Sequence, residues 1–166
     1  MHLFILSFLC LCCLWVMISD LKSRRIPNVA TLTLFVSALL AGGIHLEVTW
    51  YEQVLSGLYS SGFLALVRFA GNVFLQQDSM GFGDIKLAGA IGALLGFPGF
   101  LLSLFIASFF AVTLVYGARL ISKDLHGKHI PLGFYLGLAT FALIGLHLIA
   151  PEIFANLNFF DPLHWL

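Results

Sequence analysis

The chain has 166 residues, of which 60% are hydrophobic and 10% are charged, and its formal net charge is zero. Soluble domains carry about 25% charged residues and roughly half apolar ones. A water-soluble globule of this size could not bury so much apolar surface, so lipid must surround most of the chain. Composition thus excludes an ordinary soluble enzyme, and we expect the lipid bilayer as a partner and no nucleic acid.

The first apolar stretch, residues 1–19, starts without the Lys or Arg that opens a secretory signal. We therefore interpret it as a retained membrane span. It contains three clustered cysteines with no second half-site, a pattern that favours packing in a helix over a zinc site: Cys10, Cys12 and Cys13. The histidines show no ligand spacing either, so we expect neither a metal nor an organic cofactor.

A membrane-crossing helix needs about 20 mainly apolar residues, and several stretches approach this length. They lack the two-residue alternation of a β-barrel, so helices are expected. We predict an all-α membrane protein, a polytopic bundle of about six transmembrane helices in one domain, residues 1–166. The turn signal Phe97-Pro98-Gly99 separates a short fourth span from the fifth. The predicted spans are roughly 1–19, 29–46, 53–75, 85–97, 99–120 and 130–150.

The charges divide between the two sides of this predicted bundle. With six spans, all eight Lys and Arg lie on or near the first, third and fifth loops, whereas the second loop carries Glu47 and Glu52. Because basic loops stay in the cytoplasm, we place the odd-numbered loops there and both termini outside it. Arg68 can fall inside the third span, and we interpret it as a side chain that snorkels to the cytoplasmic interface.

Small residues recur at helical spacing along the fourth span, at Ala88, Gly92 and Gly96. Stripes of this kind let helix backbones approach closely in lipid. We therefore expect the fourth span to occupy the centre of the bundle and not its lipid-facing surface.

Two segments carry the candidate chemistry. Asp20 follows the first span, within residues 19–28, and Asp84 opens the fourth span, within residues 80–87. The charge pattern places both carboxylates at the cytoplasmic ends of their helices. Two carboxylates held close together cannot easily both ionise. The ionised one can take a proton from water while its protonated partner hydrogen-bonds a carbonyl, which predicts a hydrolase whose aspartates titrate as a unit.

Three neighbours of Asp84 are consistent with this interpretation. Gly81 and Gly83 have no Cβ, so an extended substrate strand could lie close to the aspartate. Lys86 is interpreted mainly as structural support. Simpler interpretations stay open at this point, because Asp84 could be an N-cap of its helix and Asp20 could be the first polar residue after a span.

The string Gly-Phe-Gly-Asp-Ile-Lys-Leu-Ala, residues 81–88, resembles the Gly-x-Gly-Asp signature of the prepilin peptidase family. Upstream, Asp20 followed by Arg-Ile-Pro-Asn at residues 25–28 is similar to the corresponding part of that family. Residues 129–134, His-Ile-Pro-Leu-Gly-Phe, match in part an Ile-Pro-Phe-Gly-Pro-like stretch before the family's last span, and we assign them no catalytic role. The three matches keep the family's order and cover most of the chain.

The resemblance implies an aspartic-type endopeptidase that removes the leader peptide of type IV prepilin or pseudopilin precursors. It also implies a multi-pass protein of the bacterial inner membrane with its active site toward the cytoplasm, and it carries the two catalytic roles onto Asp20 and Asp84. Larger members have an added cytoplasmic segment with paired cysteines and N-methylate the new pilin end. This sequence shows no such segment, so it resembles the short forms of tight-adherence pilus systems, and we expect no methylation.

Two other classes stay open. Signal-peptide-peptidase-like and presenilin-like enzymes also use Gly-x-Gly-Asp, but their first aspartate lies within a span, commonly after Tyr, whereas Asp20 follows Ser19. A small transporter subunit or membrane scaffold could use its acids to conduct protons or to hold partners. Transporters commonly show inverted repeats with broken helices, and we find no such internal symmetry.

Overall fold

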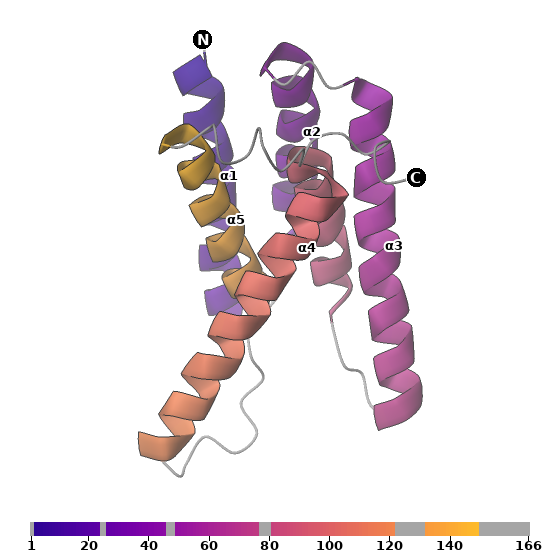
Figure 1. Cartoon of the computed structure of the whole chain (residues 1–166), viewed down its shortest axis with the longest axis vertical. Coiled ribbons are helices and arrows are strands. Elements are labelled where there is room, and N and C mark those ends of the chain that lie inside the picture. The colour runs from indigo at the N-terminus through magenta and orange to yellow at the C-terminus, as the bar shows by residue number, and fades with distance from the viewer. Residues whose placement is uncertain (1, 24–25, 46–48, 77–80, 122–131, 150–166) are drawn as a thin grey trace.

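The computed structural model describes five stretches of the chain: residues 2–23, 26–45, 49–76, 81–121 and 132–149. These residues are almost entirely helical, and the helices pack side by side as a bundle (Figure 1). The helices are α1 (His2–Ser23), α2 (Asn28–His45), α3 (Trp50–Leu75), α4 (Phe82–Ile121) and α5 (Leu132–Ile149). The all-α prediction is confirmed.

The described residues are assigned to five helices, and the predicted fourth and fifth spans correspond to the two helical segments of α4, which a kink separates. Gly96 interrupts α4 with φ 75° and ψ 166°, a backbone conformation that favours glycine, and Pro98 follows in the next turn. Figure 1 shows the two halves of α4 running in different directions from this kink. At 1.5 Å per residue the first half is roughly 20 Å long, which is shorter than the hydrocarbon core of a bilayer.

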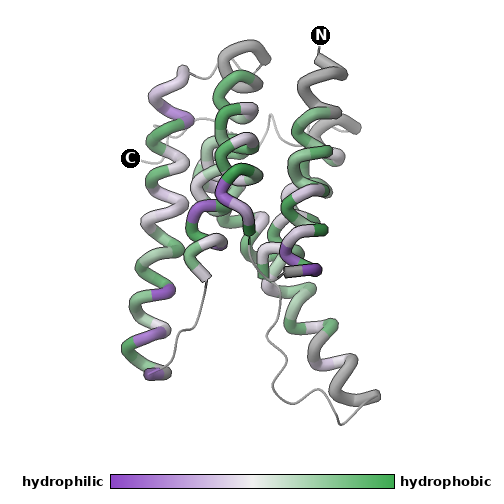
Figure 2. The backbone as a smooth tube through the Cα atoms, turned by 180° about the vertical axis from the view of Figure 1, so that it is seen from behind, coloured by the Kyte–Doolittle hydropathy of each residue, from purple (hydrophilic) through white to green (hydrophobic). Residues whose placement is uncertain are grey.

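The outer surface of the bundle has the character of a membrane protein. Two helical segments, Trp50–Phe74 and Phe82–Leu114, are long and apolar enough to cross a bilayer, and Figure 2 shows hydrophobic residues along most of every helix. Large apolar side chains stay exposed along the outside in numbers that a water-soluble monomer avoids. They include Leu66, Phe69, Phe74, Phe105 and Phe109. Composition and structure therefore agree on a helical membrane protein.

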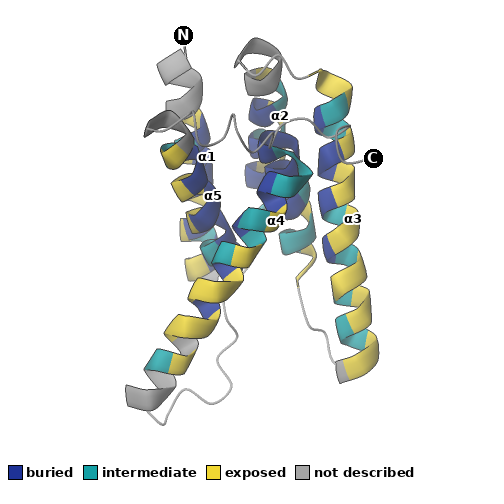
Figure 3. Cartoon of the chain, in the orientation of Figure 1, coloured by how far each residue is buried: buried dark blue, intermediate teal, exposed yellow. Residues whose placement is uncertain are grey.

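The first half of α4 is the centre of the bundle, as the small-residue stripe predicts. α4 contacts α2, α3 and α5, and Figure 3 shows its first half among the most buried parts of the chain. Its buried residues include Leu87, Ala88, Ala90, Ile91 and Ala93. The second half of α4 and the later part of α3 are much more exposed.

Small residues bring α3 and α4 into close contact, which we call the α3–α4 contact. A β-carbon built on Gly57 would lie 2.8 Å from the main-chain oxygen of Gly89, and one built on Gly92 would overlap the side chain of Ser60. Ser60 itself donates a hydrogen bond to the Ser56 carbonyl oxygen at 2.7 Å, so its hydroxyl is satisfied within α3. The contact thus depends on glycine for the separation of the two helices.

At the start of α3, the main-chain N–H of Thr49 donates to Oε2 of Glu52 at 3.0 Å, which fixes the first turn. One turn further, the buried Gln53 donates from Nε2 to the Ala38 carbonyl oxygen of α2 at 3.0 Å.

In α1, Cys12 and Cys13 are buried in the core, which agrees with the packing interpretation of the cysteines.

Candidate active site

Asp20 lies in the last turn of α1 and not in a loop after it, because α1 continues to Ser23. The residue is only 6% exposed. Its Oδ2 accepts a hydrogen bond from the main-chain N–H of Phe134 at 2.8 Å, and Phe134 belongs to the first turn of α5. Asp20 is therefore a buried side chain held across a helix interface, which excludes the interpretation of a polar residue that merely follows a span.

Asp84 is the third residue of α4, which begins at Phe82. Its N–H donates to the Gly81 carbonyl oxygen at 3.3 Å, so Asp84 lies inside the first turn and the N-cap interpretation is wrong. The carboxylate is half-buried, and a β-carbon on Gly81 would stand 3.6 Å from its Oδ2. A carboxylate in the first turn of a helix is stabilised by the partial positive charge of that helix end.

The two predicted aspartates meet at one end of the bundle, where α1 ends and α4 and α5 begin (Figure 1). Gly83, next to Asp84, and Gly133, which contacts Asp20, both lie against Ile26, so the two carboxylates belong to one cluster. Two carboxylates in such proximity favour a state in which they share one proton. The arrangement can supply a general base and a general acid to one bound water.

Ile26, in the segment between α1 and α2, packs against the first turns of both α4 and α5, beside the two aspartates. A β-carbon on Gly83 would lie 3.1 Å from Cβ of Ile26, and a β-carbon on Gly133 would lie 2.8 Å from its Cδ1. In the sequence, Ile26 lies in a matched motif, and Gly133 lies in another and also at helical spacing from Gly137. Their juxtaposition comes from the packing of α4 and α5, which no local pattern reveals.

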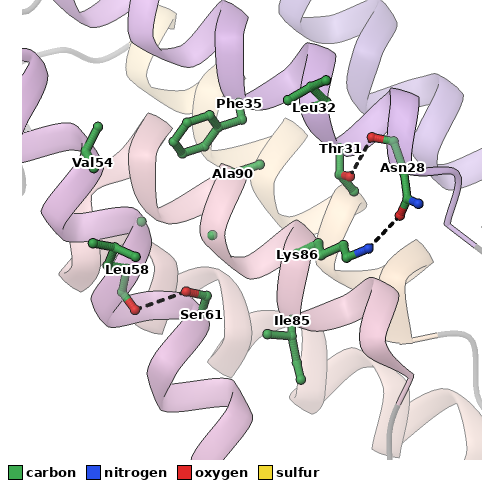
Figure 4. A pocket seen from close by; sticks show the side chains of 12 residues that line it. Asn28, Thr31, Leu32, Phe35, Val54, Leu58, Ser61, Ile85, Lys86 and Ala90 are labelled. Carbon is green, nitrogen blue, oxygen red and sulfur yellow. Dashed lines mark hydrogen bonds between the residues drawn. The ribbon is translucent and has the colours of Figure 1, made fainter.

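Lys86 points toward α2. Its Nζ donates to Oδ1 of Asn28 at 2.7 Å (Figure 4), and this hydrogen bond joins the first turn of α4 to the first turn of α2. Arg68, in the later part of α3, lies with its Cζ 3.8 Å from the centre of the Phe82 ring. Both cations therefore flank the start of α4, at the same end of the bundle as the aspartates.

A cavity of about 470 Å³ lies between α2, α3 and α4 (Figure 4). Mainly apolar side chains line it, and neither aspartate does. Two of its hydroxyls donate within their own helices, Thr31 to the Asn28 carbonyl oxygen and Ser61 to the Leu58 carbonyl oxygen, both at 3.0 Å. The cavity and the aspartate pair are thus separate features, although Ile85 and Lys86 line the cavity from the turn that carries Asp84.

Comparison with known proteins adds an independent line of evidence on the family of this chain. Residues 7–116 match the model of the type IV leader peptidase family. The chain is 29% identical over 131 residues to a prepilin leader peptidase/N-methyltransferase of Aeromonas hydrophila, covering 75% of this chain and 44% of that protein. A protein of the same description from Vibrio cholerae serotype O1 is 32% identical over 77 residues, covering 46% of this chain and 30% of its own length.

The chain thus spans less than half the length of the curated relatives that it matches. No solved structure shows a significant match. The matched family region contains α2 and α3 whole and both aspartates, and it extends into the second half of α4. Because it covers well over half of the chain, this protein belongs to the type IV leader peptidase family.

Proposed function

We propose that this protein is a membrane aspartic endopeptidase that removes the leader peptide of type IV prepilin-like precursors, with Asp20 and Asp84 as its catalytic pair. The observation that carries the proposal is the position of both carboxylates at one end of the bundle, where Gly83, next to Asp84, and Gly133, which contacts Asp20, lie against the same residue, Ile26. Membership of the type IV leader peptidase family supports a prepilin-type substrate, and so do the names of the relatives from Aeromonas and Vibrio.

The proposed reaction is hydrolysis of one peptide bond by water. The ionised carboxylate of the pair takes a proton from the water while the protonated one donates a hydrogen bond to the scissile carbonyl oxygen. The water oxygen bonds to the carbonyl carbon, and the tetrahedral intermediate collapses as the C–N bond breaks and the leaving amine takes a proton from the pair. Because the two carboxylates titrate together, acid and base are roles of the pair and not of one residue.

We place this site at the cytoplasmic face of the bacterial inner membrane. Arg68 and Lys86 flank the start of α4 beside Asp84, whereas Glu52 lies at the start of α3, at the other end of the bundle. Basic residues near the ends of spans favour the cytoplasmic side. A precursor whose leader stays in the cytoplasm would then present its scissile bond at the level of the aspartates.

The test is co-expression with a prepilin-like precursor, followed by the mass of the processed product. We expect the wild-type protein to remove the leader and both Asp20→Ala and Asp84→Ala to leave the precursor intact. Glu52→Gln is the matched control, because glutamine preserves the cap of α3 far from the aspartates. Normal processing by the two aspartate variants would overturn the proposal. A cut inside the membrane span of the precursor would instead favour a signal-peptide-peptidase-like activity.

A further inference from the structure

We infer that the first turn of α5 is a third part of the active site, in which the Phe134 N–H and the absent side chain of Gly133 set the position of the Asp20 carboxylate. The inference rests on the proposed function. It makes Gly133 and Phe134 positioning residues, because both act on the reaction only through Asp20.

The first observation is the hydrogen bond across the interface of α1 and α5. The Phe134 N–H donates to Oδ2 of Asp20 at 2.8 Å. N–H groups in the first turn of a helix have no acceptor within that helix, and the partial positive charge there attracts a carboxylate. This bond engages Oδ2, and we assign Oδ1 the role of facing water or the partner aspartate.

The second observation is the space at Gly133, which is buried against Asp20 and Ile26. A β-carbon at position 133 would lie 2.9 Å from Oδ2 and 3.2 Å from Cγ of Asp20, and 2.8 Å from Cδ1 of Ile26. The terminal methyl of Ile26 can rotate away from such a contact. The Asp20 carboxylate can retreat only by lengthening its hydrogen bond to Phe134, so a side chain at 133 would displace a catalytic group.

The same helix provides two comparison glycines. A β-carbon on Gly137 would meet the flexible side chain of Met17 at 2.7 Å, whereas one on Gly145 would meet nothing within 4 Å. Alanine at 133, 137 and 145 therefore tests a contact with a carboxylate, a contact with an apolar side chain and no contact at all. If α5 had a purely structural role, Gly133→Ala would have the same kind of effect as Gly137→Ala.

The first experiment measures kcat and KM for precursor cleavage by each purified full-length variant in lipid vesicles. We expect Gly133→Ala to lower kcat at least about tenfold with KM unchanged, since displacing a catalytic group costs rate and not binding. Gly137→Ala should lower the melting temperature without this loss of kcat, and Gly145→Ala should change neither. Wild-type kcat in Gly133→Ala, or its full recovery when Ile26→Ala is added, would overturn the inference.

The second experiment removes the hydrogen bond without adding volume at position 133, and so it does not depend on the folding of Gly133→Ala. Proline is tolerated in the first turn of a helix but has no N–H, so Phe134→Pro is compared with Phe134→Ala, which keeps the donor. We expect kcat to be about tenfold lower for the proline variant than for the alanine variant. Equal kcat values in the two variants would overturn the inference.

Melting temperatures separate this inference from the proposed function. The difference in melting temperature between Phe134→Pro and Phe134→Ala should become smaller in an Asp20→Ala background, because the carboxylate that accepts the hydrogen bond is then gone. A precursor left intact by the wild-type protein would overturn the proposed function. A smaller melting-temperature difference in the Asp20→Ala background would still support the hydrogen bond between Phe134 and Asp20. Cleavage by the wild type together with an unchanged difference would overturn the positioning role alone.

Discussion

Two glycine contacts in this bundle have similar geometry and differ in what the glycine faces. At the α3–α4 contact, a β-carbon on Gly92 would overlap the hydroxymethyl group of Ser60. At the contact between α5 and α1, a β-carbon on Gly133 would press on the carboxylate of Asp20. The first contact joins two helices through small residues, which is the usual means of close packing in lipid. The second brings a helix end onto a buried acid.

This difference shows that stability alone can explain the α3–α4 contact but not the contact at Asp20. Close packing of α3 on α4 gains dispersion contacts, and the Ser60 hydroxyl at this contact is satisfied by the Ser56 carbonyl oxygen. Burying Asp20 removes a carboxylate from water, and one hydrogen bond from Phe134 offsets only part of that cost. A buried acid beside a second acid is therefore the part of the fold that chemistry accounts for better than stability does.

The largest effect is expected from Asp84→Asn, a substitution of nearly equal shape. It removes one of the two carboxylates that share a proton, so we expect precursor cleavage to fall by about 10²–10⁴-fold. It also removes the repulsion between Asp84 and Asp20, so the melting temperature should stay the same or rise. Activity assays and thermal unfolding in the same detergent check both parts, and a variant that loses activity by unfolding would contradict the separation of chemistry from stability.

Gly92→Ala tests the other side of the comparison. The new methyl group must push Ser60 and the backbone of α3 away from α4, so we expect a loss of about 1–3 kcal/mol in the free energy of unfolding. The activity of the folded fraction should stay near that of the wild type. Gly62→Ala, on an exposed position of α3 with nothing within 4 Å, is the control and should cost nothing measurable. A stable but inactive Gly92→Ala protein would show that the α3–α4 contact serves the chemistry as well.

The sequence predicts the features that depend on local patterns. Apolar runs indicate the helices, the small-residue stripe indicates that the first half of α4 is central, and the Gly-x-Gly-Asp string draws attention to Asp84. The charge pattern, read through six spans, led to the expectation that Asp20 and Asp84 share one side of the membrane. The helices, the stripe and the string need only the identity of neighbours within a few turns of helix, whereas the charge pattern needs the count of spans.

The features that the sequence does not predict depend on residues far apart in the chain. Asp20 and Phe134 are 114 positions apart, so the burial of Asp20 within α1 depends on a partner that no local pattern near residue 20 indicates. The available signal is the partial motif at 129–134, which by itself indicates no catalytic role. By contrast, the turn signal at residues 97–99 is a local pattern, and the non-helical residue that divides α4 lies one position before it, at Gly96.

Gly83→Ala is expected to have an intermediate effect. Its methyl group would lie 3.1 Å from Cβ of Ile26, so Ile26 must move by a few tenths of an ångström against the α5 side of the site. We expect kcat/KM to fall about tenfold through this displacement, with little change in the melting temperature. Gly117→Ala lies on the same helix with nothing within 4 Å and should leave both values unchanged. A fall in kcat/KM for both variants would mean that α4 is sensitive to alanine in general.

The smallest effect is expected at the hydrogen bond between Lys86 and Asn28. Both residues are exposed, so the bond competes with water and its contribution to the free energy of unfolding should not exceed about 1 kcal/mol. A double-mutant cycle with Lys86→Met and Asn28→Ala measures that coupling, and cleavage by each variant measures its relevance to the reaction. If Lys86 only ties α4 to α2, the two single variants lose the same small stability and keep their activity. If Lys86→Met alone abolishes cleavage while the coupling stays small, the Lys86 ammonium group acts in the reaction together with the two aspartates. The part of α4 that serves the chemistry would then extend from Asp84 to Lys86.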